Sequence, residues 1–264
     1  MATDKPVVLI IGGGWQSPAS YDKLAKALEA ASYEVHCPRH PSLNQARPPT
    51  DGLASDSRHM RAYAKKLVDS GRRVVALMHS YGGQVGSNSL HGLGLDSRSK
   101  RGLPGGVSDL VYLCAFALPE GGSVAGKIKE MGDEAFMPFL LNFDQDMTLF
   151  FHGPPGSASA DQRGFEADIN ATMVRWNGEC LYNAITHCAW REMPVTYIYT
   201  PYDSVMSLTY QTSMVALLEE QGRKVQTYKL ATGHFAHLTA ADAIVDVINK
   251  VVRGIPTVVH GTEQ

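Results

Sequence analysis

A serine lies where an apolar run gives way to glycines, which is the pattern of a strand that turns sharply into a helix. Residues 74–83 read VVALMHSYGG, with Ser80 at the turn and Gly82 and Gly83 behind it. A serine on such a turn projects its hydroxyl outward, and the next N–H faces the oxyanion formed when that hydroxyl attacks a carbonyl. Ser80 is therefore the predicted nucleophile. Serines before glycine are more often structural, however, and Met78 replaces the small residue usual in this turn.

A serine hydroxyl needs a general base to act as a nucleophile at neutral pH, and ten histidines compete for that role. His234 lies in the sequence TGHF, directly after the last predicted strand. That position is at the carboxyl edge of the sheet, where open α/β sheets bind ligands. His237 is the main rival, but it falls in the first turn of the next helix, where the helical face restricts its direction. We therefore predict His234 as the base.

The base in turn needs a carboxylate that orients its ring and stabilises its charged form. Asp203 follows a predicted strand in the turn TPYDS, and the chain order Ser80, Asp203, His234 is the one that a strand-turn-helix nucleophile requires. The alternative is that Asp203 only caps a helix beginning near Val205, since aspartate is a favoured N-cap. Four other aspartates fit less well, because they lie within 117–191: Asp133, Asp144, Asp146 and Asp168.

A glycine run follows the first predicted strand and could hold a negatively charged oxygen. Gly12, Gly13 and Gly14 allow the backbone to approach a substrate carbonyl closely, and we predict the N–H groups of Gly14 and Tyr81 as oxyanion donors. Such a run could instead cradle a phosphate. The G-x-G-x-x-G spacing of dinucleotide sites is absent, because Ser17 stands where the last glycine should be.

Metal and cofactor signals are weak. His36, Cys37 and His40 are close in sequence, but they straddle a predicted strand end and Pro38, and neither Cys-x-x-Cys nor His-Glu-x-x-His spacing occurs. We therefore expect no metal and no cofactor.

The elements that must position these residues alternate between strands and helices. Apolar runs rich in β-branched residues predict strands at 6–11, 33–37, 73–77, 110–114, 195–199 and 225–230. Helical patterns cover 21–31 and about 54–69, and the basic, glycine-rich stretch 97–106 is predicted as a surface loop. Strands that are apolar throughout are typical of a sheet covered on both faces. The predicted class is α/β, a doubly wound and mostly parallel sheet.

The alternation lapses between residues 117 and 191, which we interpret as an inserted helical lid. The core would then comprise 1–116 and 192–253, with 254–264 as a C-terminal tail. The inserted segment is rich in methionine and phenylalanine, which are as often ordinary core as pocket wall. Its place after the nucleophile strand favours a pocket, and the predicted substrate-binding residues are Trp15, Met131, Met137, Phe150 and Phe151.

Composition bounds the partners. The chain has 264 residues with a net charge of −2, so no electrostatic field favours nucleic acid or an anionic membrane. No signal peptide or membrane span is evident, and the cytoplasm is the expected location. Four scattered cysteines predict free thiols rather than a disulfide framework. A small-molecule substrate is the expected partner, and a homodimer stays open.

With these residues in place, the chain resembles the lipase- and esterase-like α/β-hydrolases, especially the small branch of fungal hydrolases, plant methylesterases and hydroxynitrile lyases. The segments that carry the resemblance are GGWQSP (13–18), HSYGG (79–83), YLCAF (112–116), YTPYD (199–203) and GHF (233–235). It implies the α/β-hydrolase fold and an acyl-enzyme route through Ser80 and His234. Two departures are Gly12, where many relatives have histidine, and Met78.

The predicted function is that of a serine hydrolase that cleaves a small to medium carboxylic ester or lactone, with an apolar or aromatic pocket. A non-hydrolytic enzyme could use the same triad, as a lyase, in lactonisation or in carbon–carbon cleavage, because the fold alone does not choose between these reactions. A receptor that kept the fold and lost turnover is a third hypothesis, disfavoured because all three triad members are present.

Overall fold

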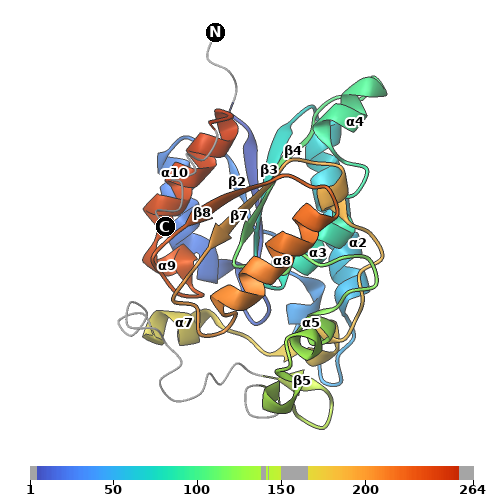
Figure 1. Cartoon of the computed structure of the whole chain (residues 1–264), viewed down its shortest axis with the longest axis vertical. Helices are drawn as coiled ribbons and strands as arrows, with labels where there is room; N and C mark the ends of the chain where they lie inside the picture. Colours follow the sequence, from blue (N-terminus) through green and yellow to red (C-terminus); the bar gives the residue numbers. More distant parts are fainter. Residues whose placement is uncertain (1–4, 138–140, 142, 150–165, 256–264) are drawn as a thin grey trace.

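Six parallel strands form the sheet at the centre of the computed structural model, which describes residues 5–137, 141, 143–149 and 166–255. Their order across the sheet is β2-β1-β3-β4-β7-β8, so the chain winds outward in both directions from the middle (Figure 1). The strands are β1 (Val7–Ile11), β2 (Val35–His36), β3 (Arg73–His79), β4 (Gly106–Leu113), β7 (Val195–Tyr199) and β8 (Val225–Lys229). The doubly wound parallel class predicted from the sequence is confirmed.

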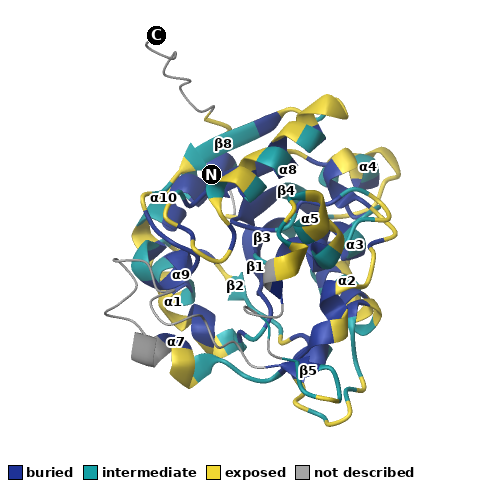
Figure 2. Ribbon diagram, turned by 60° about the horizontal axis from the view of Figure 1, so that its bottom comes forward, coloured by how far each residue is buried: buried dark blue, intermediate teal, exposed yellow. Residues whose placement is uncertain are grey.

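Two hydrophobic cores cover the two faces of this sheet. In β1, all five side chains are fully buried; Val7, Leu9 and Ile11 join one core, and Val8 and Ile10 join the other. Successive strand side chains point to opposite faces, so a strand buried on both sides must be apolar at every position. Figure 2 shows the central strands mostly in dark blue between helices whose outer sides are exposed, whereas the edge strands β2 and β8 are largely teal.

Helices on each face complete these cores. One core includes apolar side chains of α2 (Leu53–Asp69), α3 (Gly82–Ser89) and α8 (Leu208–Glu220). The other includes those of α1 (Asp22–Ala30) and α10 (Ala241–Val252). The short helices η1 (Pro18–Tyr21), η2 (Pro41–Leu43) and α9 (Ala236–Thr239) lie in the connections. Within the described ranges, no helix is both long and apolar enough to cross a membrane.

The basic stretch at 97–106 differs from its prediction as a surface loop. Its first part belongs to helix α4 (Leu95–Lys100), and β4 already begins at Gly106. Arg98 is buried because its guanidinium donates hydrogen bonds to the carbonyl oxygens of Pro104 and Gly105 and to Asp69. The buried guanidinium therefore holds the turn that leads into β4 by hydrogen bonds to its backbone. The composition of this stretch does not predict such a role.

The inserted segment lies between β4 and β7 in the chain. Its described elements are α5 (Val124–Glu130), η3 (Glu134–Phe136), β5 (Thr148–Leu149), α7 (Glu166–Thr172), β6 (Trp176–Asn177), η4 (Gly178–Leu181) and η5 (Ala189–Arg191). Besides helices it contains an antiparallel β5–β6 pair, which the sequence analysis missed. Val174 donates a backbone hydrogen bond of 2.7 Å to Trp15, so this segment lies against the loop after β1. The predicted division at 117 and 191 stays a prediction, and most of the predicted tail lies outside the described residues.

Candidate active site

Ser80 sits on the sharp turn between β3 and α3 with a backbone φ of +54°. This left-handed conformation is rare for a residue other than glycine and is found where the surrounding structure enforces it. The turn is held by the Ser80 carbonyl oxygen, which accepts hydrogen bonds from the N–H groups of Gly83 and Phe116 at 3.0 and 3.1 Å. The serine side chain is therefore held on a rigid, strained bend.

The glycines after Ser80 are required by close packing. A Cβ atom on Gly82 would lie 2.0 Å from the carbonyl oxygen of Ile11, and one on Gly83 would lie 2.7 Å from that of Phe116. Both obstacles are backbone atoms, which cannot rotate away as a side chain can. The two glycines therefore let α3 approach the backbone at the ends of β1 and β4 closely.

Met78 is accommodated by a glycine elsewhere. A Cβ atom on Gly86 of α3 would lie 2.2 Å from the Met78 sulfur and 2.9 Å from its Cγ atom. The long side chain two residues before the serine therefore occupies the space that a larger residue at position 86 would need. The small residue at this contact between strand and helix is therefore Gly86 on the helix, whereas the usual pattern has it on the strand, two residues before the serine.

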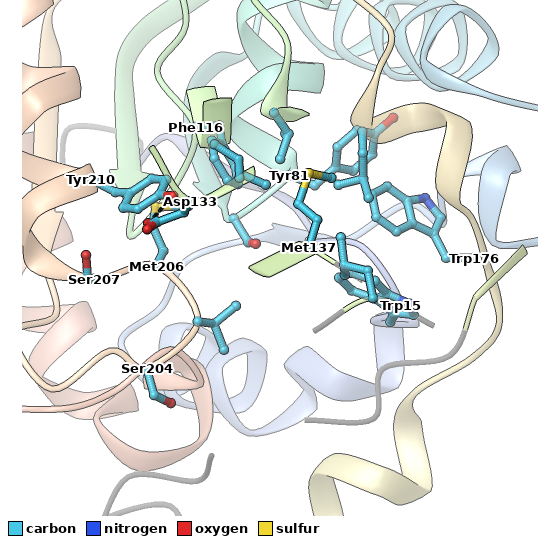
Figure 3. Close-up of a pocket in the computed structure, with 16 residues that line it drawn as sticks. Trp15, Tyr81, Phe116, Asp133, Met137, Trp176, Ser204, Met206, Ser207 and Tyr210 are labelled. Carbon is cyan, nitrogen blue, oxygen red and sulfur yellow. Dashed lines mark hydrogen bonds between the residues drawn. The ribbon is translucent and has the colours of Figure 1, made fainter. Parts of the chain in front are cut away.

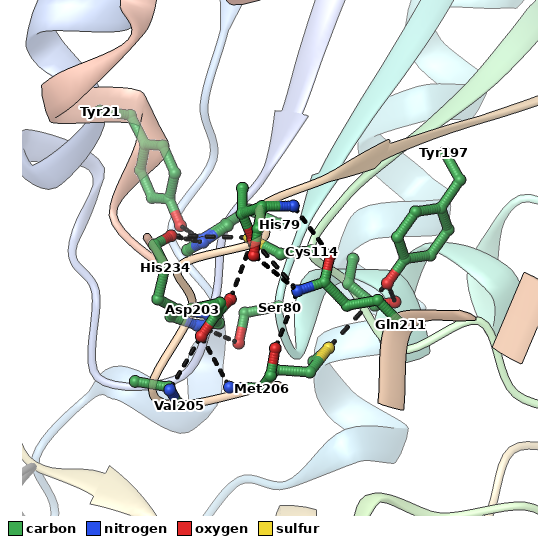
Figure 4. A network of polar contacts seen from close by, with 12 residues as sticks. Tyr21, His79, Ser80, Cys114, Tyr197, Asp203, Val205, Met206, Gln211 and His234 are labelled. Carbon is green, nitrogen blue, oxygen red and sulfur yellow. Dashed lines mark hydrogen bonds and ion pairs between the residues drawn. The ribbon is translucent and has the colours of Figure 1, made fainter. Parts of the chain in front are cut away.

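Ser80, His234 and Asp203 come together at the carboxyl ends of their strands (Figure 4). The Nε2 atom of His234 lies 3.1 Å from the Ser80 hydroxyl oxygen, and its Nδ1 atom lies 2.7 Å from Oδ2 of Asp203. Both His234 and Asp203 are buried, with 4% and 6% of their surface exposed. A carboxylate only accepts hydrogen bonds, so Nδ1 carries the proton and Nε2 is free to accept the serine proton.

Backbone donors hold the Asp203 carboxylate in place. Its Oδ1 atom accepts hydrogen bonds from the N–H groups of Val205 and Met206 at 2.8 and 2.7 Å, and Oδ2 also accepts from the Thr200 hydroxyl. Helix α8 begins only at Leu208, so Asp203 caps the turn before the helix rather than the helix itself. The capping alternative and the triad role are therefore compatible, because different oxygens serve them.

The rival His237 lies in α9, against the rings of Tyr21 and His79. Its two ring nitrogens are buried, and neither has a hydrogen-bond partner among the described residues. Burial lowers the pKa of His237 to about 3, with a smaller contribution from nearby His234. A base must be within hydrogen-bond reach of the nucleophile, and of these two histidines His234 meets that condition.

A second polar chain, which the sequence analysis missed, lies behind the triad. The backbone N–H of Gly13 donates to the Tyr21 hydroxyl at 2.7 Å, and this hydroxyl contacts Nδ1 of His79 at 2.8 Å. His79 Nε2 lies 2.9 Å from the carbonyl oxygen of His234, which can only accept. Thus Nε2 of His79 donates to the His234 carbonyl oxygen, and Nδ1 of His79 accepts from the Tyr21 hydroxyl. Both ring nitrogens of His79 are therefore hydrogen-bonded.

These donor and acceptor roles agree with the protonation states that burial favours for Tyr21 and His79. Desolvation lowers the pKa of His79 well below its usual value, with smaller contributions from His234 and His237, and it raises the pKa of Tyr21. His79 is therefore neutral and Tyr21 protonated at neutral pH. This series of hydrogen bonds joins the glycine loop to the backbone of the candidate base, His234. Its one signal in the sequence is that His79 directly precedes Ser80.

The glycine loop after β1 packs tightly around this chain and the pocket. A Cβ atom on Gly12 would lie 2.8 Å from the Tyr21 ring, and one on Gly14 would lie 2.7 Å from the Trp176 ring. The N–H groups of Gly14 and Tyr81 donate no hydrogen bond to another of the described residues. Whether they act as oxyanion donors stays a prediction.

A pocket of about 300 Å³ opens beside Ser80 (Figure 3). Of the predicted substrate-binding residues, Trp15 and Met137 line it, whereas Met131 is not among its described lining. Phe150 and Phe151 lie outside the described residues. Most of the wall is apolar, from residues that include Phe116, Val124, Ile128, Leu141, Leu181 and Met206.

A buried carboxylate supports one side of this pocket. Asp56 is fully buried on α2, and it accepts hydrogen bonds from the backbone and side chain of Ser42 at 2.8 and 2.6 Å and from the Tyr81 hydroxyl at 2.9 Å. The indole N–H of Trp176 donates to the same Ser42 hydroxyl. Asp56 therefore orients two pocket side chains without lining the pocket itself.

One group of side chains has the spacing of a metal site, within the part of the chain that the structure describes. The ligand atoms of His79, Cys114 and His234 all lie within 4.8 Å of one another. Both nitrogens of His79 already have partners, and burial raises the pKa of the Cys114 thiol well above its usual value. A metal ion binds neutral imidazole nitrogens and thiolate, so these residues do not fit one.

The cysteines and the other suggested metal ligands have ordinary roles. All four cysteines are free thiols, as predicted. His36 contacts the Tyr63 hydroxyl and the Glu34 carboxylate, each at 2.7 Å, while His40 Nε2 contacts the Gly12 carbonyl oxygen. Both nitrogens of His36 and Nε2 of His40 therefore already have hydrogen-bond partners within the protein.

Comparison with known proteins identifies the family of this chain. A model of the alpha/beta hydrolase family matches residues 7–247. The alpha/beta hydrolase nvfD of Aspergillus novofumigatus is 26% identical over 258 residues, covering 93% of this chain and 96% of that protein. The probable hydrolase R7 of a Phoma species is 25% identical over 253 residues, covering 94% of this chain and 98% of that protein.

A solved structure is similar over the same length. The pyrethroid hydrolase from Sphingobium faniae JZ-2 superposes with a TM-score of 0.71 at 16% identity, covering 94% of this chain and 97% of that one. At this identity the likeness concerns the fold alone. Because the family model covers most of the sequence, the chain belongs to the alpha/beta hydrolase family, and it has the α/β-hydrolase fold of an enzyme in that class.

Proposed function

We propose that this protein is a serine hydrolase that cleaves a small to medium carboxylic ester or lactone through an acyl-enzyme. The observation that carries the proposal is the hydrogen-bonded series from Ser80 through His234 to Asp203, with Ser80 at the wall of a largely apolar pocket. Nucleophile, base and orienting acid are the groups that acyl transfer through a serine uses.

In the first half of the reaction, the Ser80 oxygen attacks the carbonyl carbon while its proton passes to Nε2 of His234. The tetrahedral intermediate then collapses, its bond to the leaving oxygen breaks, and the proton on His234 moves to that oxygen. In the second half, water loses a proton to His234 and attacks the acyl carbon. The acid is released, and Ser80 regains its proton.

The negative charge on the intermediate needs donors that are in place before the reaction. We propose the N–H groups of Gly14 and Tyr81 for this role. Tyr81 follows Ser80 directly at the start of α3, where backbone N–H groups are unpaired and the helix dipole favours negative charge. Gly14 lies next to Gly13, whose own N–H is already bound to Tyr21.

The pocket supports the proposed size and polarity of the substrate. Its volume of about 300 Å³ suits a compact ligand, and its described apolar wall suits an aromatic or branched aliphatic group. Two tryptophans, Trp15 and Trp176, contact each other edge to face at a centroid distance of 4.7 Å and form part of this wall.

The test is reaction with a fluorophosphonate, which forms a stable adduct only with an activated serine. The adduct would be located by mass spectrometry in the parent protein and in Ser80→Ala, His234→Ala and Ser207→Ala. Ser207 lines the same pocket and is the matched serine control. We expect labelling at Ser80 that vanishes in Ser80→Ala, falls by about a hundredfold or more in rate in His234→Ala, and persists in Ser207→Ala.

Hydrolysis would then be measured with 4-nitrophenyl butyrate and an aryl lactone. Labelling at Ser80 together with turnover supports the proposal. No adduct on folded protein would overturn the acyl-enzyme route and favour a lyase or another non-hydrolytic use of the triad. Tight ligand binding with an adduct but without turnover would favour a receptor.

A further inference from the structure

The pocket beside Ser80 contains one charged side chain among its described lining residues. Asp133, which lies just after α5, is that residue, and no lysine, arginine or histidine accompanies it there. The other lining residues with polar side-chain atoms are serines, tyrosines and two tryptophans, and the tryptophan N–H groups donate to Leu149 and Ser42 outside the lining. A lone carboxylate in a largely apolar wall is costly to cover unless something pairs with it.

Asp133 is held in position by Tyr210 of α8. The Tyr210 hydroxyl donates a hydrogen bond of 2.6 Å to Oδ2 of Asp133, and the Asp133 N–H donates to the carbonyl oxygen of Ile128. Burial, and then the nearby carboxylate, raises the pKa of Tyr210, so its hydroxyl keeps its proton and acts as the donor. The contact thus orients the carboxylate and uses only part of its accepting capacity.

A carboxylate can accept about four hydrogen bonds, and Tyr210 supplies one. The described part of the chain provides no cationic partner for Asp133. Water can satisfy the remaining positions when no ligand is bound, but a substrate that fills the pocket displaces that water. A ligand without a donor would therefore leave part of the accepting capacity of this half-buried carboxylate unused, whereas a ligand with a donor would not.

The pair stands apart from the aromatic wall. In Figure 3, Asp133 and Tyr210 lie together on one side of the pocket, while Trp15 and Trp176 lie on the other. A ligand can therefore have its apolar body against the tryptophans while a separate polar group reaches the carboxylate.

We propose that Asp133, oriented by Tyr210, is a specificity-determining residue that binds a hydrogen-bond donor on the substrate, a hydroxyl or a protonated amine remote from the reacting carbonyl. This proposal rests on the proposed function, whose substrate class it narrows to esters or lactones that carry such a group. It assigns Asp133 no part in bond breaking.

The test uses ligands that cannot be hydrolysed, so that binding is measured apart from turnover. Calorimetric titrations would compare 4-propylphenol, 4-propylanisole and 4-propylbenzylamine, which share an apolar body and differ in the donor. The proteins are the parent, Asp133→Ala, Asp133→Asn and Glu134→Gln. Glu134 is the neighbouring carboxylate, exposed and outside the pocket lining, and it serves as the matched control.

We expect the parent and Glu134→Gln to bind the phenol or the amine at least about tenfold more tightly than the ether, the factor typical of a hydrogen bond to a charged group. In Asp133→Ala this preference should disappear. In Asp133→Asn the amine should lose its advantage more completely than the phenol, because an amide still accepts a hydrogen bond but carries no charge.

A parent protein without donor preference, including one that binds none of the three ligands, would overturn the inference, as would a preference that survives in Asp133→Ala. A preference for the amine alone would support it and identify the ligand group as a cation; a preference for the phenol alone would identify a hydroxyl. Ester turnover and fluorophosphonate labelling are measured separately, so failure of the proposed hydrolase activity is distinguishable from failure of this inference.

Discussion

Replacement of Gly86 by alanine tests whether Met78 depends on the absence of a side chain on the facing helix. The new Cβ atom would lie 2.2 Å from the Met78 sulfur, 2.9 Å from its Cγ and 3.2 Å from Cδ1 of Ile11. Carbon atoms in contact prefer a separation of about 3.5–4.0 Å, so the methionine must move by more than about 1 Å. Forced overpacking of this kind costs about 1–3 kcal/mol.

The net effect of Gly86→Ala is smaller than the steric cost, because alanine is favoured over glycine inside a helix by about 1 kcal/mol. We therefore expect the free energy of unfolding to fall by about 1 kcal/mol. In a Met78→Ala background the main obstacle is gone and only the 3.2 Å approach to Cδ1 of Ile11 is left, so the same substitution should raise stability by up to about 1 kcal/mol. The difference between backgrounds, about 1–3 kcal/mol, measures the steric conflict.

Urea unfolding of the four proteins in this double-mutant cycle would measure the coupling. Met214→Ala is the control background, because Met214 is equally buried but lies on α8, away from the Gly86 contacts. Gly86→Ala should be additive with it to within about 0.5 kcal/mol. If Gly86→Ala and Met78→Ala were also additive, the methionine in the nucleophile turn would not depend on the glycine that faces it, and the reasoning would be refuted.

Three further predictions concern the buried polar groups. Tyr21→Phe removes a hydroxyl that serves two buried partners, and urea unfolding should show a loss of about 2–4 kcal/mol; a loss below about 1 kcal/mol would mean that water replaces the hydroxyl. The pKa of His237 is lowered to about 3 by burial, so the unfolded chain binds a proton that the folded chain does not, and stability falls as pH falls from about 6.5 towards 3. His237→Phe should reduce that slope by about 1.4 kcal/mol per pH unit, and an unchanged slope would contradict neutral burial of this ring. Burial raises the thiol pKa of all four cysteines, which are Cys37, Cys114, Cys180 and Cys188. They should therefore react slowly with a disulfide reagent at pH 8 in the folded protein, and all should react after unfolding. Fast reaction in the folded protein would contradict this prediction.

The three residues proposed for chemistry could be located from the sequence because each follows a strand closely. Ser80 follows β3, Asp203 follows β7 and His234 follows β8, and all three strands are parallel. Parallel strands present their carboxyl ends at one edge, so residues distant in the chain are predicted to meet there. Their distances and protonation pattern required the structure.

The supporting residues had no comparable signal. Tyr21 and His79 are 58 positions apart, and nothing in the local sequence around Tyr21 indicates a hydrogen bond to the nucleophile strand. The sequence offers Asp133 only as a poor candidate for the triad acid, although this residue lines the pocket. Met131, directly after α5, belongs to the residue types typical of a pocket wall, yet its sulfur contacts the Ser213 hydroxyl on α8 at 3.6 Å.

The sequence by itself determined the parallel sheet, the order of its strands along the chain and the turn that carries Ser80, because continuous apolar runs and glycines constrain the backbone locally. Only the tertiary structure decided which buried polar groups find partners, where Met78 fits and which side chains form the pocket. These depend on contacts between residues on different elements, such as Gly86 with Met78 across the helix–sheet interface and Tyr210 with Asp133 on one side of the pocket. Such contacts follow from shape and hydrogen-bond geometry in three dimensions, which a pattern of residue types does not contain.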